Sequence, residues 1–348
     1  MTHRFPLPVT VVGLAAALML SGCAAGEGSS TTDPVPASAS ADAGWSSDTL
    51  DVDFATYNPL SLIIKDQGWL EATLGDAVAV TWTQSAGSNK ANEALRAGAV
   101  DVGSTAGSAA LLARANGSPI KTIDIYTQPE WSAIVVGKDS PITSVADLAG
   151  HSVAATKGTD PYFFLLQALE ANGLSLDDVE VQNLQHADGR VALENGSVDA
   201  WAGLDPLMAD TEVNAGSKLI FRDVDFNSYG FLNAREEFLT DHADLTQLVV
   251  DAYEKARAWA LANPNETAAI LADVSGIDPA IAQKVILERT TIDLDPVPGE
   301  AQRSVLATIG PIFVGSGDVS NQDQIDEALD TLFDDSFAES ADRSRISG

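Results

Sequence analysis

Five segments of the chain share one design, in which an apolar run leads through a loop of small and polar residues into a helix-like run. They are residues 56–64, 84–95, 102–117, 157–166 and 200–212. Free backbone N–H groups in the first turn of a helix attract anions, and small residues let a ligand approach that backbone. The chemistry that these loops predict is therefore the binding of a small anion by hydrogen-bond donors.

Residue sets that support catalysis or metal binding are missing from the sequence. The four histidines are scattered, and none lies at a metal-binding spacing from another His or from a Glu: His3, His151, His186 and His242. There is no Gly-x-Ser-x-Gly nucleophile motif and no Gly-x-x-x-x-Gly-Lys phosphate loop. Cys23 is the only cysteine, which excludes an internal disulfide and a Cys-based metal site. We expect no catalytic residue, no metal and no cofactor, and we expect His186 alone among the histidines to lie near the binding site.

The elements that must position these loops alternate between short strands and amphipathic helices, the pattern of parallel α/β sheets. Strands are expected at 50–56, 78–82, 120–126 and 132–137 in a first series, and at 151–157, 179–184, 198–203 and 218–222 in a second. Helices are expected at 61–70, 90–98, 161–173 and 189–196. The ligand crevice of such sheets lies beyond the carboxyl ends of the strands, which is where the five loops fall.

The phrase Ala-Leu-x-x-Gly-x-Val-Asp occurs twice, at 94–101 and at 192–199. An offset of 98 residues is far longer than the roughly 20 to 50 residues of a solenoid repeat, so it fits two similar α/β domains. Gly98 and Gly196 are expected to end helices, and Asp101 and Asp199 to stand at the start of the next strand. We interpret the phrase as scaffold and expect function in the loops that follow it.

The composition allows a large core and excludes several partners. The chain has 348 residues, of which 45% are hydrophobic, enough for two domains. It has 19 Lys and Arg against 50 Asp and Glu, a net charge of −31. Such a charge disfavours nucleic acid and adsorption to an anionic membrane. Any membrane contact must therefore be covalent or mediated by another protein.

The N-terminus predicts such a covalent contact. Residues 1–22 have a short basic start and an apolar run at 9–20 that is too short to span a bilayer but fits a signal peptide. Leu-Ser-Gly-Cys at 20–23 resembles the bacterial lipobox, in which the Cys is lipidated; an ordinary secretory signal is the alternative. Residues 23–47 would then be the lipidated Cys23 and a flexible tether rich in Ser, Thr, Gly, Pro and Ala. We expect an extracytoplasmic protein that is anchored to the cell membrane as a lipoprotein.

Four longer stretches resemble the substrate-binding lipoproteins of ABC importers in the aliphatic-sulfonate, taurine and nitrate group. They are residues 57–71, 85–121, 129–170 and 196–209, and the match extends from about Asp51 to about Phe337. The most distinctive blocks are Gly-Ser-Thr at 103–105, Asp-Ser-Pro-Ile at 139–142, and Val-Asp-Ala-Trp at 198–201.

The resemblance implies an α/β, type II periplasmic-binding-protein fold, with two α/β lobes and a ligand cleft between them. Lobe one would comprise residues 48–138 plus 228–338, and lobe two residues 139–227. The strand in 229–238 would be the return crossing, and 339–348 would be a disordered tail.

A sulfonate is a small permanent anion, and the negative charge of the chain does not prevent its binding, because surface carboxylates are screened over about 8 Å whereas aligned N–H groups act at contact. We therefore expect neutral donors to bind it. The candidates for the headgroup are Ser88, Asn89, Ser104, Thr105, Gly158 and Thr159. Those for the organic part are Trp131, Tyr162 and Trp201, and those for the rim are Asn58, Gly203 and Asp205. Helix capping is the competing interpretation of Ser88, Thr105 and Asp205.

Asp160 places a carboxylate where an anion is expected to bind. It either caps the helix that begins at Pro161, or it faces the cleft and accepts a hydrogen bond from an amino or hydroxyl group on the tail of a sulfonate.

Together these features predict the monomeric solute-binding component of an ABC importer, which binds an aliphatic sulfonate and delivers it to a membrane permease. Taurine, nitrate and aromatic or heterocyclic anions are the alternative ligands. Enzymes related to thiamine-pyrimidine synthases share the broad family, but their Cys-rich iron-binding motif is missing here. A transcriptional effector-sensing domain shares the fold but would carry a helix-turn-helix instead of a lipobox.

Overall fold

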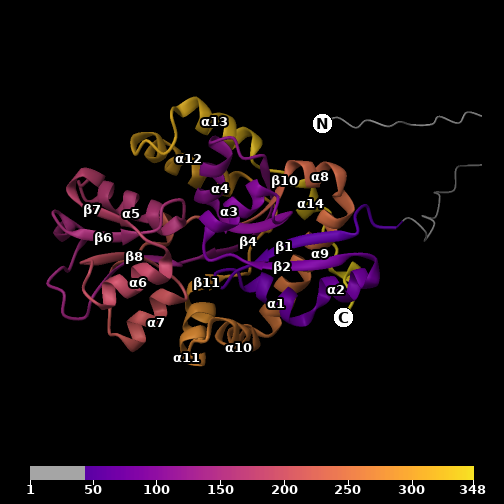
Figure 1. Ribbon diagram of the computed structural model, residues 1–348, viewed down its shortest axis with the longest axis horizontal. Coiled ribbons are helices and arrows are strands. Elements are labelled where there is room, and N and C mark those ends of the chain that lie inside the picture. Colours follow the sequence, from indigo (N-terminus) through magenta and orange to yellow (C-terminus); the bar gives the residue numbers. More distant parts are fainter. Residues whose placement is uncertain (1–43) are drawn as a thin grey trace, which may run out of the picture. The chain divides into compact units, whose positions relative to one another are not determined.

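The computed structural model describes residues 44–348, and the structural statements below concern that part of the chain. The predicted signal peptide, the lipobox and most of the predicted tether fall in residues 1–43 and lie outside the described residues. Two sheets with helices around them make up residues 44–348 (Figure 1). In the same residues, no helix is both long enough and apolar enough to cross a bilayer.

The first sheet has six strands and contains both chain directions. In spatial order they are β11 (Thr290–Thr291), β4 (Ile120–Pro129), β10 (Gly230–Arg235), β3 (Val102–Ala106), β1 (Thr49–Phe54) and β2 (Ala79–Gln84). Strand β1 is parallel to β2 and β3, whereas β10 runs antiparallel to β3 and β4. Strand β10 therefore inserts between two earlier strands, as the expected return crossing requires.

The second sheet has five strands. In spatial order they are β7 (Glu180–Asn183), β6 (Ser152–Ala155), β8 (Ala200–Leu204), β5 (Ser132–Val136) and β9 (Lys218–Phe221). The strands β6, β7 and β8 are parallel, and β5 is antiparallel to β8 and β9.

The pairing of β5 corrects one predicted boundary. Residues 132–137 were expected in lobe one, but β5 pairs only with strands of the second sheet. The first crossing is therefore at Glu130 and Trp131, between β4 and β5. Both strands are buried apolar runs, so their sequences do not reveal that they belong to different sheets.

The helices flank the two sheets (Figure 1). Around the first sheet and toward the C-terminus they are α1 (Pro59–Gln67), α2 (Trp69–Leu74), α3 (Ser88–Ala97), α4 (Gly107–Ala115), α8 (Glu236–Asp241), α9 (Ala243–Ala262), α10 (Pro264–Ser275), α11 (Pro279–Gln283), α12 (Glu300–Gly315), α13 (Gln322–Thr331) and α14 (Ser336–Glu339). Those that connect strands of the second sheet are α5 (Asp160–Ala171), α6 (His186–Glu194) and α7 (Leu207–Asn214). Helix α12 packs on both α4 and α5, where the rings of Phe163 and Phe313 lie 4.2 Å apart between centroids.

The repeated phrase performs the same structural task in both sheets. The carboxylate of Asp101 accepts the backbone N–H of Asp51 at 3.0 Å, and its own N–H donates to the carbonyl of that residue at 2.7 Å. Asp199 makes the same pair of bonds with Ser152, at 2.9 and 3.1 Å. Each Asp thus joins the start of its strand to the neighbouring parallel strand. The prediction that the phrase is scaffold is confirmed.

The last ten residues are ordered, which corrects the prediction of a disordered tail. Ile346 is buried in the core under the first sheet. Arg345 forms an ion pair of 3.0 Å with the buried carboxylate of Asp251, and Lys255 Nζ donates to the carbonyl of Gly348 at 2.6 Å. The segment is polar in sequence, but its partners on α9 lie about 90 residues upstream in the sequence.

Candidate functional site

A small chamber lies where the two sheets meet. From the first lobe it is lined by Tyr57, Ser88 and Ala106, from the second by Thr159, Asp160, Pro161 and Leu204, and from the first crossing by Trp131. All of these residues except Trp131 fall in the five predicted loops, where a strand ends or a helix begins. The chamber has a volume of about 10 Å³.

A second hollow of about 10 Å³ adjoins the chamber through two shared residues, Tyr57 and Trp131. Their rings are nearly perpendicular, at 86°, with centroids 6.0 Å apart. A volume of that size holds about one water molecule. Any organic solute therefore requires the rings or the lobes to move apart.

The carboxylate of Asp160 is saturated by donors of the protein. One oxygen accepts from the hydroxyls of Ser108 at 2.5 Å and Ser228 at 2.7 Å, and the other from Trp131 Nε1 at 2.7 Å and the Ser228 N–H at 2.9 Å. Burial raises the pKa of Asp160, and these four hydrogen bonds oppose that rise. Ser108 belongs to α4 of the first lobe and Trp131 to the first crossing. Ser228 belongs to the second crossing, the segment 222–229 between β9 and β10. Asp160 thus fastens the second lobe to the first and to both crossings, and it does not cap its own helix.

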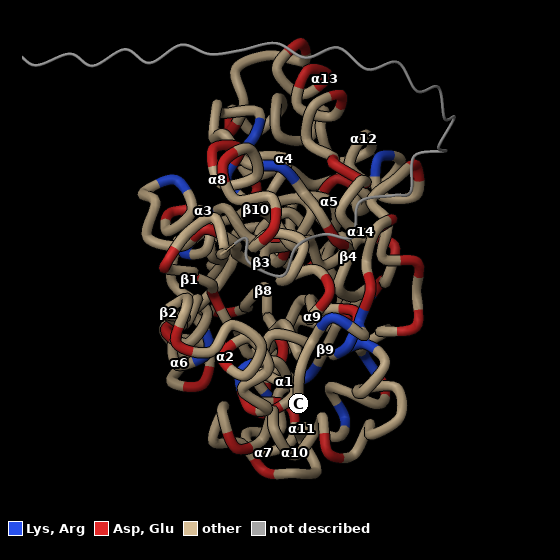
Figure 2. The backbone as a smooth tube through the Cα atoms, turned by 90° about the vertical axis from the view of Figure 1, so that its right-hand side faces the viewer, with Lys and Arg blue, Asp and Glu red and all other residues tan. Residues whose placement is uncertain are grey.

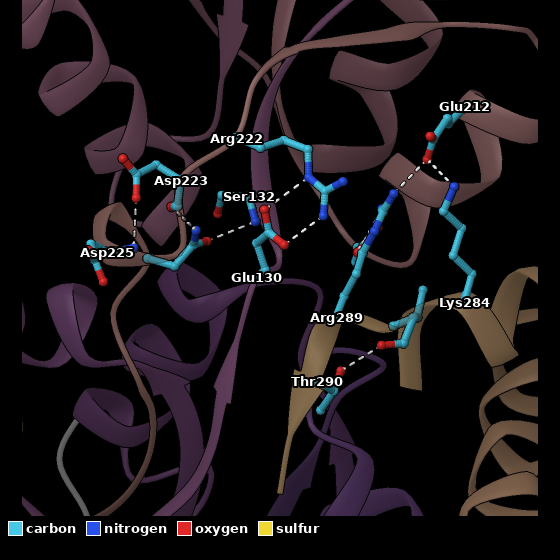
Figure 3. A network of polar contacts seen from close by, with 12 residues as sticks. Glu130, Ser132, Glu212, Arg222, Asp223, Asp225, Lys284, Arg289 and Thr290 are labelled. Atoms are coloured by element: carbon cyan, nitrogen blue, oxygen red, sulfur yellow. Dashed lines mark hydrogen bonds and ion pairs between the residues drawn. The ribbon is translucent and has the colours of Figure 1, made fainter. Parts of the chain in front are cut away.

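A buried ion-pair network also joins the lobes (Figure 3). The guanidinium of Arg289, just before β11, lies 3.1 Å from Asp205 and 2.6 Å from Glu212, and Lys284 contacts the same Glu212 oxygen at 2.9 Å. The Arg289 and Asp205 side chains are only 2% and 3% exposed. Burial raises the pKa of Asp205 to about 6, against the lowering effect of Arg289. Asp205 is therefore held by a cation from the opposite lobe.

Glu130, in the first crossing, forms a further ion pair with Arg222, with Arg222 Nη2 and a Glu130 carboxylate oxygen 2.6 Å apart (Figure 3).

Elsewhere, Asp and Glu are spread over the loops and helices of the described chain, with fewer Lys and Arg among them (Figure 2). Within residues 44–348, no three His, Cys, Asp or Glu side chains group as metal ligands do.

The predicted headgroup residues divide into two groups. Ser88 and Thr159 line the chamber, and Gly158 lies against the side chain of Asn89 across the lobes. Ser104 and Thr105 are fully buried, line neither hollow and have internal partners. The Ser104 hydroxyl donates to Asp53 at 3.0 Å, and the Thr105 hydroxyl accepts from Asn233 at 2.8 Å.

The predicted residues for the organic part and the rim are also divided. Trp131 lines both hollows and Asp205 lines the second, whereas Tyr162 and Trp201 belong to hydrophobic clusters of the second lobe. Asn58 is fully buried, caps α1 through Ser61 and donates to Tyr253 Oη at 2.9 Å. Gly203 lies within β8, where a Cβ would be only 2.9 Å from the Val135 side chain of the neighbouring strand β5. The glycine is therefore explained by packing within the sheet.

Tyr57 and Arg289 were not among the predicted site residues. Tyr57 lies one residue before Asn58, within the predicted loop 56–64. Its place in that loop could have identified it as a site residue. Arg289 lies in a segment with no motif, 84 residues beyond its partner Asp205. Only the fold brings that cation to the junction of the lobes.

Two mixed α/β sheets, two crossings and a chamber between them define the type II periplasmic-binding-protein fold. Within that class, the chain belongs to the NMT1/THI5-like family, whose model matches residues 64–267.

The relatives are chiefly binding proteins. The chain is 30% identical over 223 residues to the "Putative aliphatic sulfonates-binding protein" of Escherichia coli (strain K12), an alignment that covers 64% of this chain and 70% of that one. It is similar in structure to the alkanesulfonate-binding protein SsuA from Xanthomonas axonopodis pv. citri bound to MOPS, with a TM-score of 0.73, 24% identity and coverage of 81% of this chain and 98% of that one. The fold extends to the desulfurization enzyme DSZB, with a TM-score of 0.62, 16% identity and coverage of 84% and 98%.

Proposed function

We propose that this chain is the extracytoplasmic solute-binding component of an ABC importer and that it binds an aliphatic sulfonate without transforming it. The observation that carries the proposal is the chamber lined by residues of both lobes and of the first crossing. A solute in that position contacts both lobes at once, so its binding favours the closed arrangement over the open one. The relatives named for sulfonate binding support the choice of ligand.

The headgroup would be held by neutral donors at the starts of helices. Ser88 is the first residue of α3, and Thr159 directly precedes α5, so both stand where backbone N–H groups are free to bind an anion. The Ser88 oxygen accepts the Ala106 N–H at 2.9 Å, which leaves its hydroxyl hydrogen available for the solute. Ser104 and Thr105 would not contact the solute but would hold these loops in place through their internal hydrogen bonds.

The rings of Tyr57 and Trp131 would cover the organic part. They fill the space between the two hollows, so their separation opens a single larger cavity. Closure around the solute would be completed by the bonds of Asp160 and by the Arg289 network, both of which span the lobes. The closed protein would then dock on a permease as a monomer, held near the membrane by a lipid on Cys23.

A thermal-shift panel tests the ligand. Ethane-, butane- and hexanesulfonate, taurine, nitrate and benzoate would be compared with sodium chloride at equal ionic strength. A ligand at 100 times its Kd stabilises the native state by about 2.7 kcal/mol, which gives a clear rise in Tm. We expect that rise with at least one sulfonate. A response to nitrate or benzoate alone would remove the sulfonate assignment, and no response to any solute would contradict the solute-binding role.

A further inference from the structure

A buried histidine with one free ring nitrogen lies at the seam between the lobes, next to the chamber. His186 is the first residue of α6 in the second lobe and is 2% exposed. Its Nδ1 lies 3.2 Å from Thr156 Oγ1, and that hydroxyl donates its own hydrogen to the carbonyl of Leu184 at 2.7 Å. The hydrogen between Thr156 and His186 must therefore come from Nδ1, and Nε2 of the neutral ring is an acceptor.

Burial lowers the pKa of His186 to about 3, so the ring is neutral at physiological pH. Its Nε2 has no hydrogen-bond partner in residues 44–348. A buried acceptor without a partner costs free energy, and such atoms call for a specific explanation.

A second acceptor lies at the same point, from the opposite lobe. Asn89 Oδ1, on the first turn of α3, is also buried and has no partner in the described residues. A Cβ placed on Gly87 would be 3.0 Å from Asn89 Oδ1 and 3.0 Å from His186 Nε2. The two acceptors therefore lie beside the same face of Gly87, no more than 6 Å from each other. The backbone of Gly87 is extended, with φ of 166°, so the requirement for glycine there is one of space.

Two neighbouring buried acceptors need a hydrogen-bond donor that reaches them. An alkyl chain provides none, whereas an ammonium or hydroxyl group does. This group must lie close to the headgroup, because Ser88, which lines the chamber, is the residue between Gly87 and Asn89. Asp160, the other candidate acceptor for such a group, has its lone pairs occupied by Ser108, Ser228 and Trp131.

We propose that His186 Nε2 and Asn89 Oδ1 form a subsite for a hydrogen-bond donor on the tail of the solute, so that the protein selects amino- or hydroxyalkanesulfonates over plain alkanesulfonates. This inference rests on the proposed function and narrows its substrate class. Because the acceptors belong to opposite lobes, the donor also helps to close the cleft.

Three solutes of equal heavy-atom count test the selection: 2-aminoethanesulfonate, 2-hydroxyethanesulfonate and propane-1-sulfonate. Titration calorimetry with the wild-type protein should show at least one of the first two binding about 10-fold more tightly than propane-1-sulfonate. In His186→Phe, which keeps a ring and removes the acceptor, that preference should disappear. His151→Phe, the same change at a half-exposed histidine of the same lobe, should retain it.

Gly87→Ala provides a second variant in case His186→Phe fails to fold. Its methyl group would lie 3.0 Å from both acceptors, so it should keep a donor from reaching them and abolish the same preference, whereas Gly137→Ala, with no atom within 4 Å of the new Cβ, should retain it. Labelling of the ring nitrogens with 15N adds a direct readout, since the Nε2 resonance of His186 should move with 2-aminoethanesulfonate and stay in place with propane-1-sulfonate.

The outcomes separate the two proposals. Equal binding of all three solutes by the wild type would overturn the subsite and leave sulfonate binding intact. Equal weakening of all three in His186→Phe would mean that His186 and Asn89 bond to each other across the lobes, which also overturns the subsite. Binding of none of the three would overturn the subsite, and if no sulfonate of the thermal-shift panel binds either, the sulfonate assignment falls with it.

Discussion

The indole Nε1 of Trp131 donates a 2.7 Å hydrogen bond to the carboxylate of Asp160, and this bond fastens the start of a second-lobe helix to the first crossing. The other oxygen accepts from Ser108 in the first lobe and from Ser228 in the second crossing. One carboxylate thus contacts all the parts of the molecule that must move when the cleft opens. Its four bonds are formed in this closed arrangement, and Asp160 and Ser108 can remain bonded only while the lobes stay together.

Asp160→Asn should lower stability without changing ligand selection. An amide cannot accept four hydrogen bonds, so buried donors lose their partner, at a cost of about 1 to 3 kcal/mol in the free energy of unfolding. Urea denaturation would measure the loss. Because no carboxylate oxygen is free for the solute, taurine and butanesulfonate should weaken by the same factor. Asp147, which also accepts four hydrogen bonds but on the surface, is the control, and Asp147→Asn should cost much less. Selective weakening of taurine would show that Asp160 contacts the ligand.

Arg289→Gln should destabilise the protein strongly. It removes the cation from the buried carboxylate of Asp205, and breaking a buried pair on one side costs about 3 to 5 kcal/mol. Arg303→Gln breaks a partly exposed pair with Asp330 and should change stability by no more than about 0.5 kcal/mol. The loss at Arg289 should shrink at acid pH, because protonated Asp205 no longer needs a cation. Equal effects of the two variants would show that the buried pair contributes no more than a surface pair.

His186 should make stability depend on pH. Its pKa is about 3 in the native protein against an ordinary value of 6.5, so between these values the unfolded chain binds a proton that the native chain does not. Stability from this residue is complete above pH 6.5 and falls toward pH 3, by at most about 1.4 kcal/mol per pH unit. The groups that face the ring are Thr156, Gly87 and Asn89, which are uncharged. Urea unfolding at several pH values should show a shallower decline in His186→Phe than in the wild type. Parallel curves would mean that the ring takes up its proton at the same pH in the native and unfolded states, which would contradict the lowered pKa.

Cys23→Ser should release the protein from the membrane. Residue 23 lies outside the described part of the chain, so the prediction depends on the lipobox resemblance alone. The variant should move from the membrane fraction to the soluble extracytoplasmic fraction, and its Tm should match that of the wild type. Cell fractionation with immunodetection would follow both proteins. Membrane association that persists in the variant would contradict the lipoprotein assignment.

Much of the fold could be predicted because it depends on local patterns. The alternation of strands and helices, the Gly98 cap of α3, and the hydrogen bonds of Asp101 and Asp199 all follow from short stretches of sequence. Helix α6 is capped by Asn195, and the expected Gly196 lies one residue beyond it. The loops that approach the site were predicted for the same reason. Ser88, Thr159 and Asp160 do line the chamber, as their positions after strands or before helices suggested. Trp131, which lies outside those loops and was a candidate for the organic part of the solute, lines it too.

The sheet to which β5 belongs was decided by tertiary structure, because the apolar pattern of a buried strand is the same in either sheet. So were the partners of the buried polar groups. Ser108, Trp131 and Ser228 lie 52, 29 and 68 residues from Asp160, and Arg289 lies 84 residues from Asp205. The sequence determined that these side chains can donate or accept hydrogen bonds. The tertiary structure decided which of them are buried together and therefore pair. A buried polar group can bond only to groups that the fold brings within about 3 Å, and the packing of the two lobes against each other determines those groups.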